Sequence, residues 1–130
     1  MILGVGVDLV EVNRMQALLN RRYAARFIER VFSPEERAVC EAATRPAQCY
    51  AARFAAKEAV AKAFGTGFSS GVSPGMISVT GGERNRPQIH LSQKAREYAE
   101  TRNVSAIHVS LTHTATSACA VVVVETSGSS

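Results

Sequence analysis

The chain has 130 residues, 46% of them hydrophobic and 20% charged, which is typical of a single globular domain. Its formal net charge of +4 favours an acidic or phosphorylated partner. No stretch is apolar enough to span a membrane, and acidic residues interrupt the N-terminal apolar run, which excludes a signal peptide. The three cysteines lack the spacing of a zinc site or a disulfide framework. We therefore expect reduced thiols in a cytoplasmic protein.

Residues 2–10 are predicted to form a strand with two different faces. One face carries branched apolar side chains at positions 3, 5, 7 and 9, and the opposite face carries Gly4, Gly6 and Asp8. Glycines strip a strand face of side chains and allow another backbone to approach it closely. Asp8 would therefore lie near the end of a strand, on the side that another element packs against.

Three helices are expected next. The first covers residues 11–30, and its surface is rich in arginine (Arg14, Arg21, Arg22, Arg26 and Arg30). The second begins at Ser33-Pro34-Glu35-Glu36, which combines an N-cap serine, a proline at the first helical position and a capping-box glutamate, and runs to about residue 43. The third runs from about residue 47 to 64, contains seven alanines between residues 51 and 63, and ends at Gly65.

The C-terminal half is expected to contain short strands and one helix. Strands are predicted at residues 76–79, 88–90, 105–112 and 118–124, with a helix over residues 91–101. The last two strands would form a hairpin, and the continuous apolar run of residues 118–124 predicts a strand covered on both faces. We expect one domain over residues 1–125 and a frayed tail over residues 126–130.

Asp8 and Glu58 are the candidate metal ligands. Two carboxylates from distant parts of the chain suit Mg²⁺, which prefers oxygen ligands and often shares them with a substrate phosphate. Each acid also has a simpler interpretation, because Asp8 could cap the following helix and Glu58 could pair with Lys62 on a helix surface. Helical geometry places Glu58 between Phe54 and several alanines, where a partly buried acid needs a cationic partner.

The segment after Glu58 has the features of a weak phosphate-binding motif. Lys62 supplies a positive charge, and Gly65 and Gly67 allow close approach of the backbone to a ligand. Arg53 begins the same segment and, judged alone, is a surface arginine. In the segment HVSLTHT, alternation places His108 and His113 on opposite faces, and His113, at the end of the strand, is the better candidate for a ligand contact.

Three blocks of sequence resemble the holo-acyl-carrier-protein synthases, the small bacterial type of 4′-phosphopantetheinyl transferase. They are GVGVDLVEVNR (residues 4–14), RFAAKEAVAKAFGTG (residues 53–67) and HVSLTHT (residues 108–114). The blocks occur in the family's order, and the resemblance covers nearly the whole chain. It implies an α+β fold in which a small antiparallel sheet packs on the long alanine-rich helix. It also implies a homotrimer with active sites between subunits.

The resemblance also implies the reaction and the residues that take part in it. Family members transfer the 4′-phosphopantetheine arm of coenzyme A to a serine of an acyl carrier protein and release adenosine 3′,5′-bisphosphate. Asp8 and Glu58 would bind Mg²⁺. The coenzyme A site would comprise Arg53, Lys62, Gly65, Gly67 and His113, and the acidic carrier protein would contact Arg14, Arg22, Arg26 and Phe27.

The sequence leaves several alternatives open. The general base could be Glu58, a metal-bound water, or Glu35 or Glu36, and the carrier protein could belong to fatty-acid or polyketide synthesis. A different class of function is a small basic domain that binds a nucleic acid or acidic protein without catalysis. That alternative explains only the arginines, and the chain lacks aromatic residues interleaved with them for base stacking. We therefore expect neither a nucleic-acid nor a membrane partner.

Overall fold

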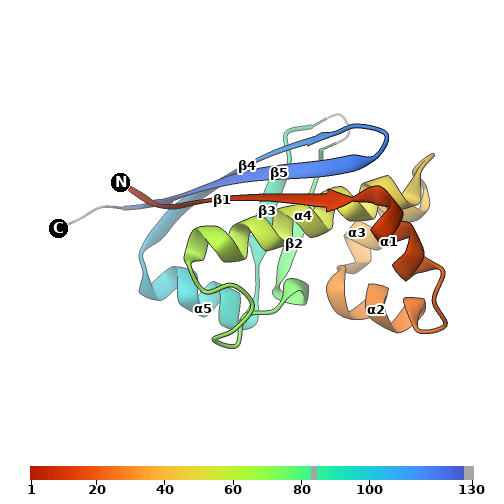
Figure 1. The fold of residues 1–130 in the computed structure, drawn as a ribbon. Coiled ribbons are helices and arrows are strands. Elements are labelled where there is room, and N and C mark those ends of the chain that lie inside the picture. The colour runs from red at the N-terminus through yellow and green to blue at the C-terminus, as the bar shows by residue number, and fades with distance from the viewer. Residues whose placement is uncertain (83–84, 128–130) are drawn as a thin grey trace.

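The computed structural model describes residues 1–82 and 85–127, and its elements follow the order β-α-α-α-α-β-β-α-β-β (Figure 1). The N-terminal half contains β1 (Ile2–Glu11), α1 (Val12–Leu19), α2 (Ala24–Val31), α3 (Pro34–Glu41) and α4 (Pro46–Phe64). A short 3₁₀ turn (Pro74–Met76) leads to β2 (Ile77–Thr80), β3 (Gln88–Leu91), α5 (Gln93–Thr101), β4 (Val104–His113) and β5 (Ser117–Thr126). None of the helices in this described part has the length and hydrophobicity of a membrane span.

The fold is α+β, as expected, and is built around α4. A three-stranded antiparallel sheet has the order β1-β5-β4, and β2 and β3 form a separate antiparallel pair. α4 runs along the three-stranded sheet, with α5 near one end and α1 to α3 near the other (Figure 1). Thirteen of the 19 residues of α4 are buried, so this helix forms the centre of the core.

The predicted close approach to the glycine face of β1 is confirmed, and the partner is α4. A Cβ atom at Gly4 would lie 1.9 Å from the carbonyl oxygen of Ala63, and one at Gly6 would lie 1.9 Å from that of Ala59. The two backbones therefore touch at positions where neither element can carry a large side chain. This contact holds Asp8, two residues after Gly6, against the same face of α4.

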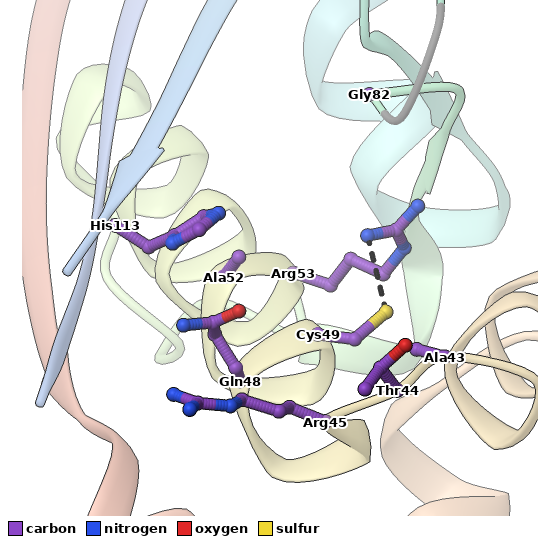
Figure 2. Close-up of a pocket in the computed structure, with 9 residues that line it drawn as sticks. All are labelled: Ala43, Thr44, Arg45, Gln48, Cys49, Ala52, Arg53, Gly82 and His113. Carbon is purple, nitrogen blue, oxygen red and sulfur yellow. Dashed lines mark hydrogen bonds between the residues drawn. The ribbon is translucent and has the colours of Figure 1, made fainter. Parts of the chain in front are cut away.

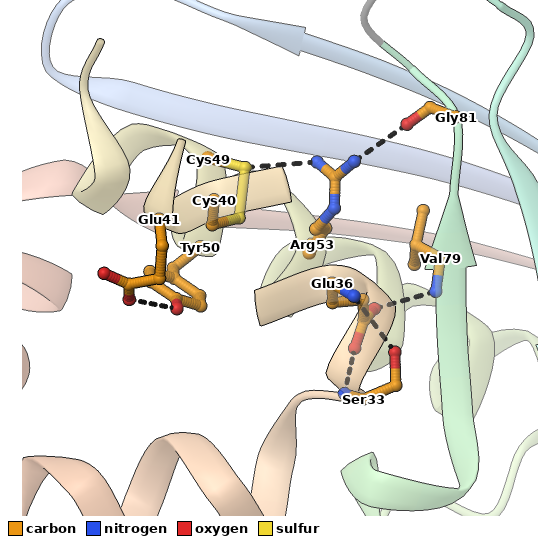
Figure 3. The surroundings of a disulfide bond; sticks show 9 residues. All are labelled: Ser33, Glu36, Cys40, Glu41, Cys49, Tyr50, Arg53, Val79 and Gly81. Carbon is orange, nitrogen blue, oxygen red and sulfur yellow. Dashed lines mark hydrogen bonds between the residues drawn. A yellow bond between two sulfur atoms is a disulfide. The ribbon is translucent and has the colours of Figure 1, made fainter. Parts of the chain in front are cut away.

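A buried ion pair joins α4 to α3 and β2. Lys57 Nζ lies 2.8 Å from Glu36 Oε1, both side chains are fully buried, and Lys57 also donates to the carbonyl oxygen of Ile77. The Glu36 carboxylate accepts further hydrogen bonds from the backbone amides of Ser33 and Val79 (Figure 3). Burial lowers the pKa of Lys57, and the negative charge of Glu36 opposes that shift. Each charge is thus compensated by several partners, which a buried ion pair requires.

Several expected elements differ from those observed. The capping box at Ser33 and Glu36 and the left-handed Gly65 at the end of α4 are confirmed. The single helix expected over residues 11–30 is wrong, because a turn at residues 20–23 separates α1 from α2. Burial alternates along β5, and Val121 is 39% exposed, so one face of this strand is open in the single chain. Of the tail expected over residues 126–130, Thr126 belongs to β5 and bonds to Met1, and the amide of Ser127 bonds to the carbonyl oxygen of Asn103, whereas residues 128–130 lie outside the described part.

The expectation of three reduced thiols is also wrong. Cys40 and Cys49 form a disulfide between α3 and α4 (Figure 3), and Cys119 is free. The two cysteines are nine residues apart, but the chain reverses direction between the helices and brings their Cα atoms to 5.3 Å. That separation suits a disulfide. Sequence spacing alone does not reveal it, because it depends on how α3 packs against α4.

Replacement of Lys57 by Met should destabilise the fold by about 3–5 kcal/mol, because it leaves the Glu36 carboxylate buried without its cation. The matched control is Lys94→Met, since Lys94 pairs with Glu97 at 3.7 Å and both side chains are well exposed. That change should alter the free energy of unfolding by less than about 0.5 kcal/mol. Urea denaturation measures both values, and equal losses in the two variants would contradict a structural role for the buried pair.

Candidate active site

Asp8 and Glu58 come together at one pocket, as expected. Asp8 extends from the end of β1, and Glu58 and Lys62 lie one turn apart on α4. All three line a cavity of about 300 Å³ that also includes Arg14 and Phe54. The contact between β1 and α4 therefore joins two acids that are 50 residues apart in sequence with two basic side chains.

Lys62 pairs with Asp8 rather than making the surface pair with Glu58 that was considered as an alternative. Its Nζ atom lies 2.8 Å from Asp8 Oδ1 and 3.1 Å from the carbonyl oxygen of Val7. The hydrogen bond to Asp8 raises the pKa of Lys62, so this side chain remains cationic. Asp8 is also not the cap of α1, whose N-cap is Glu11. Neither of the simpler interpretations of Asp8 and Glu58 describes the observed contacts.

Glu58 lies in an environment that disfavours its negative charge. Burial raises its pKa above the ordinary value, the nearby charge of Asp8 raises it further, and Lys62 partly offsets both effects. Two carboxylates that repel one another in a partly buried pocket favour the binding of a cation. Within the described residues, no cluster of three or more His, Cys, Asp or Glu side chains provides a complete metal site. The pair fits Mg²⁺, which takes few protein ligands and completes its shell with water and phosphate.

Gly65 and Gly67 follow Lys62 at the end of α4. Both have positive φ angles, of 83° and 58°, which glycine adopts without strain. A Cβ atom at either position would meet no other atom within 4 Å, so the loop surface there is open to solvent. The structure thus leaves the backbone of this turn accessible to a ligand.

Arg53 and His113 line a different pocket. This cavity of about 410 Å³ also includes Arg45, Gln48 and Cys49 (Figure 2). Arg53 donates from Nη2 to the carbonyl oxygen of Gly81 at 2.8 Å and from Nη1 to Cys49 Sγ at 3.5 Å. Asp8, Glu58 and Lys62 are absent from its lining, so in one chain Arg53 and His113 line one pocket, Lys62 lines the other, and Gly65 and Gly67 line neither.

Arg45 is a residue that the sequence analysis did not select. It precedes Pro46 at the start of α4 and lines the pocket of Arg53 and His113. The signal available in the sequence was an arginine at a helix start, where a positive charge opposes the helix dipole. A basic residue in that unfavourable position points to a role other than helix stability.

The residues expected to contact a carrier protein lie on two neighbouring helices. Arg14 on α1 lines the cavity of Asp8 and Glu58. Arg26 and Phe27 on α2 line a groove of about 490 Å³ with Tyr23, and Arg22 lies in the turn before α2. Of these residues, Arg14 therefore lies at the acidic pocket, whereas Arg22, Arg26 and Phe27 lie in and after the break between α1 and α2.

Glu36 is wrong as a candidate general base. It is fully buried and bonded to Lys57 and to two backbone amides, so a substrate cannot reach it. Its neighbour Glu35 is exposed in the first turn of α3. The capping box and the buried ion pair explain why Glu36 is present. Of the three candidate acids, Glu35, Glu36 and Glu58, Glu58 is the one that lines the pocket.

Comparison with known proteins shows the family of the chain. The family model described as the 4′-phosphopantetheinyl transferase superfamily matches residues 4–122. The chain belongs to this superfamily. A holo-acyl-carrier-protein synthase of Anaeromyxobacter sp. (strain K) is 45% identical over 130 residues, which cover 98% of this chain and 99% of the relative. The enzyme of the same name from Syntrophus aciditrophicus is 40% identical over 125 residues, with coverage of 96% and 97%.

Solved structures of transferases with that name share the fold. The crystal structure of the Neisseria meningitidis holo-acyl-carrier-protein synthase matches with a TM-score of 0.86 and 32% identity, covering 96% of this chain and 99% of that one. The Helicobacter pylori enzyme, solved in complex with coenzyme A, matches with a TM-score of 0.80 and 32% identity, covering 93% and 99%. This phosphopantetheinyl transferase chain is therefore similar to its relatives along almost its entire length.

The raised pKa of Glu58 predicts a pH-dependent effect of Glu58→Gln on stability. A carboxyl group whose pKa is higher in the folded state costs stability once it ionises, and the cost disappears below its ordinary pKa of 4.5. In the absence of added metal, Glu58→Gln should therefore be more stable than wild type at pH 7.5 and equal to it at pH 3.5. The measurement is the free energy of unfolding at both pH values. Glu100→Gln, at an exposed position of α5, should show no such gain, and a loss of stability for Glu58→Gln at pH 7.5 would contradict the assignment.

Proposed function

We propose that this chain transfers the 4′-phosphopantetheine arm of coenzyme A to a serine of an apo-acyl carrier protein, releasing adenosine 3′,5′-bisphosphate. It would therefore act as a holo-acyl-carrier-protein synthase. The observation that carries the proposal is the pocket in which Asp8, Glu58 and Lys62 meet. Membership of the transferase superfamily and the similarity to a structure solved with coenzyme A support the same conclusion.

The pocket suits attack by a hydroxyl group on a pyrophosphate. Asp8 and Glu58 would hold Mg²⁺, which supplies positive charge to the pyrophosphate when bound. Lys62 is exposed beyond its contact with Asp8 and would add a second positive charge. We assign Glu58 the proton of the carrier-protein serine, because it is the candidate base that lines this pocket. Gly65 and Gly67 would let the substrate approach the backbone at the end of α4.

We further propose that the two pockets act together across a subunit interface in a homotrimer. In one chain, Lys62 lies in one pocket, and Arg53 and His113 lie in the other. We propose that a coenzyme A molecule contacts Lys62 of one chain and Arg53 and His113 of the next. The outer face of β1 supports an interface, because Val5, Val7 and Leu9 are 57%, 51% and 63% exposed. Exposed apolar side chains on one strand face are characteristic of association surfaces.

The trimer is tested by light scattering at micromolar concentration. The expected mass is three times the 13.9 kDa of one chain. Val7→Glu should lower this mass, because it places a charge on the exposed apolar face of β1. An active wild-type monomer would contradict the shared-site proposal.

Activity should depend on both acidic residues. Asp8→Asn and Glu58→Gln each keep the side-chain shape and remove a ligand charge, and each should lower Mg²⁺-dependent turnover at least ~100-fold, or about 2.7 kcal/mol. The assay is the mass gain of an apo-carrier protein incubated with coenzyme A and Mg²⁺. Glu100→Gln, on α5, is the matched control and should retain wild-type turnover. Near-normal activity in either pocket variant would rule out the metal-binding assignment.

The carrier protein would dock on the cationic surface of α1 and α2. Acyl carrier proteins are acidic, and such attraction mainly accelerates encounter and weakens in salt. Residues 13–30 contain five arginines and one glutamate. Arg14 borders the acidic pocket, Arg22 lies in the turn between the two helices, and Arg26 and Phe27 line the groove on α2. We propose a cytoplasmic location, as expected of an enzyme with these substrates. A carrier protein of fatty-acid synthesis and one of polyketide synthesis both satisfy this chemistry.

Arg14→Glu should raise the KM for the carrier protein and leave the dissociation constant for coenzyme A almost unchanged. Arg96→Glu on α5 makes the same charge change on an exposed helix away from α1 and should have little effect on either value. The difference between the variants should shrink at 1 M salt, where the Debye length is about 3 Å. A selective loss of coenzyme A affinity in Arg14→Glu would instead assign Arg14 to the nucleotide site.

A further inference from the structure

The disulfide closes a small ring of chain that forms part of the Arg53 pocket. Cys40 lies near the end of α3 and Cys49 in the first turn of α4, and the ten residues of this ring include the connection between the helices. Ala43, Thr44 and Arg45 from this connection line the pocket together with Cys49 itself (Figure 2). The position of one pocket wall therefore depends on the link between the two sulfur atoms.

The backbone hydrogen bonds of this connection are mostly local. The amides of Ala43, Gln48 and Cys49 bond to carbonyl oxygens of Cys40 or Arg45, within the same ring. Two side-chain bonds reach beyond these local ones: the Tyr50 hydroxyl donates to Glu41 Oε2 at 2.6 Å across the two helices (Figure 3), and Gln48 Nε2 donates to the carbonyl oxygen of Thr114 at 3.0 Å. Thr44 and Arg45 are exposed. Because the described contacts are mainly local, cleavage of the disulfide would remove the main covalent restraint on this wall.

The two sulfur atoms have different surroundings. Cys40 is fully buried, whereas Cys49 is only half-buried and lines the cavity. The Arg53 guanidinium, which donates to Cys49 Sγ at 3.5 Å, would favour the thiolate form of the reduced residue. Cys49 therefore has the accessibility and the neighbouring cation of a reactive thiol, and Cys40 is placed to resolve its oxidised form.

We propose that Cys40 and Cys49 are a reversible redox pair whose oxidation by peroxide fixes the Ala43–Arg45 wall of the Arg53 pocket. The Cys49 thiolate attacks the peroxide O–O bond, which gives a sulfenic acid and releases one water after proton uptake. The Cys40 thiolate then attacks the Cys49 sulfur, which forms the S–S bond and releases a second water. Two thiols thus lose two electrons and two protons, and one peroxide becomes two waters. A small dithiol reverses the reaction by attacking Cys49 and becoming a cyclic disulfide.

Oxidation should increase the affinity of this pocket for an anionic ligand, a consequence that rests on the proposed coenzyme A site. Arg45 lies on the wall that the disulfide restrains, and Arg53 and His113 line the same cavity. A wall that is already ordered avoids the entropy cost of ordering when a ligand binds. The oxidised protein should therefore bind coenzyme A about fivefold more tightly than the reduced protein, the effect of ordering one flexible side chain.

The experiment compares full-length wild type after hydrogen peroxide and after dithiothreitol. Alkylation under denaturing conditions and intact mass should show one modified cysteine in the oxidised protein and three in the reduced protein. Hydrogen exchange should be at least ~10-fold faster at residues 42–48 in the reduced protein, with α5 as an unaffected reference. Cys119→Ser should preserve both differences. The double variant Cys40→Ser/Cys49→Ser should exchange like reduced wild type with or without peroxide.

Failure to form the Cys40–Cys49 bond, or equal exchange at residues 42–48 in both states, would overturn the proposal. Equal coenzyme A affinity in two states that exchange differently would refute the link to ligand binding. If neither state binds coenzyme A, the proposed function is wrong, and the exchange data still decide whether the disulfide fixes the pocket wall.

Discussion

The backbone contact between β1 and α4 determines where the chemistry of this protein can occur. Gly4 and Gly6 lie against the carbonyl oxygens of Ala63 and Ala59, at a distance that excludes any larger residue from the strand positions. Asp8 continues on the same strand face and meets Lys62, and Glu58 lies one turn before Lys62 on the helix. The glycines of β1 and the backbone of α4 at Ala59 and Ala63 thus bring two carboxylates to one pocket.

The surrounding elements keep α4 in place for this contact. The Lys57–Glu36 pair joins α4 to α3, and the hydrogen bonds of Glu36 and Lys57 to Val79 and Ile77 join both helices to β2. Lys57 and Glu58 are neighbours in sequence but point to different environments. Lys57 is fully buried in a structural ion pair, and Glu58 lines the open pocket. Two consecutive residues of α4 therefore have different roles: the charge of Lys57 stabilises the fold, and the charge of Glu58 is available for binding.

Much of this arrangement was predictable from sequence, because it depends on local patterns. Alternation and glycines indicated the buried face of β1, and the capping box and Gly65 indicated where α3 begins and α4 ends. The remaining features depend on tertiary contacts. The disulfide requires the packing of α3 on α4, and the burial of Glu36 requires Lys57 from another helix. Arg53 and Lys62 likewise line two different pockets, because they lie at different places around α4. In the sequence they belong to one continuous segment, which gave no sign of this separation.

The central claim is that the β1–α4 contact creates a site for a divalent cation between Asp8 and Glu58. The most direct test is a crystal structure with coenzyme A and Mn²⁺, whose anomalous scattering locates the metal. The account predicts a peak coordinated by both carboxylates and by pyrophosphate oxygens, with Lys62 against the same pyrophosphate. A metal peak on other residues, or bound coenzyme A whose pyrophosphate lies away from Asp8 and Glu58, would contradict it.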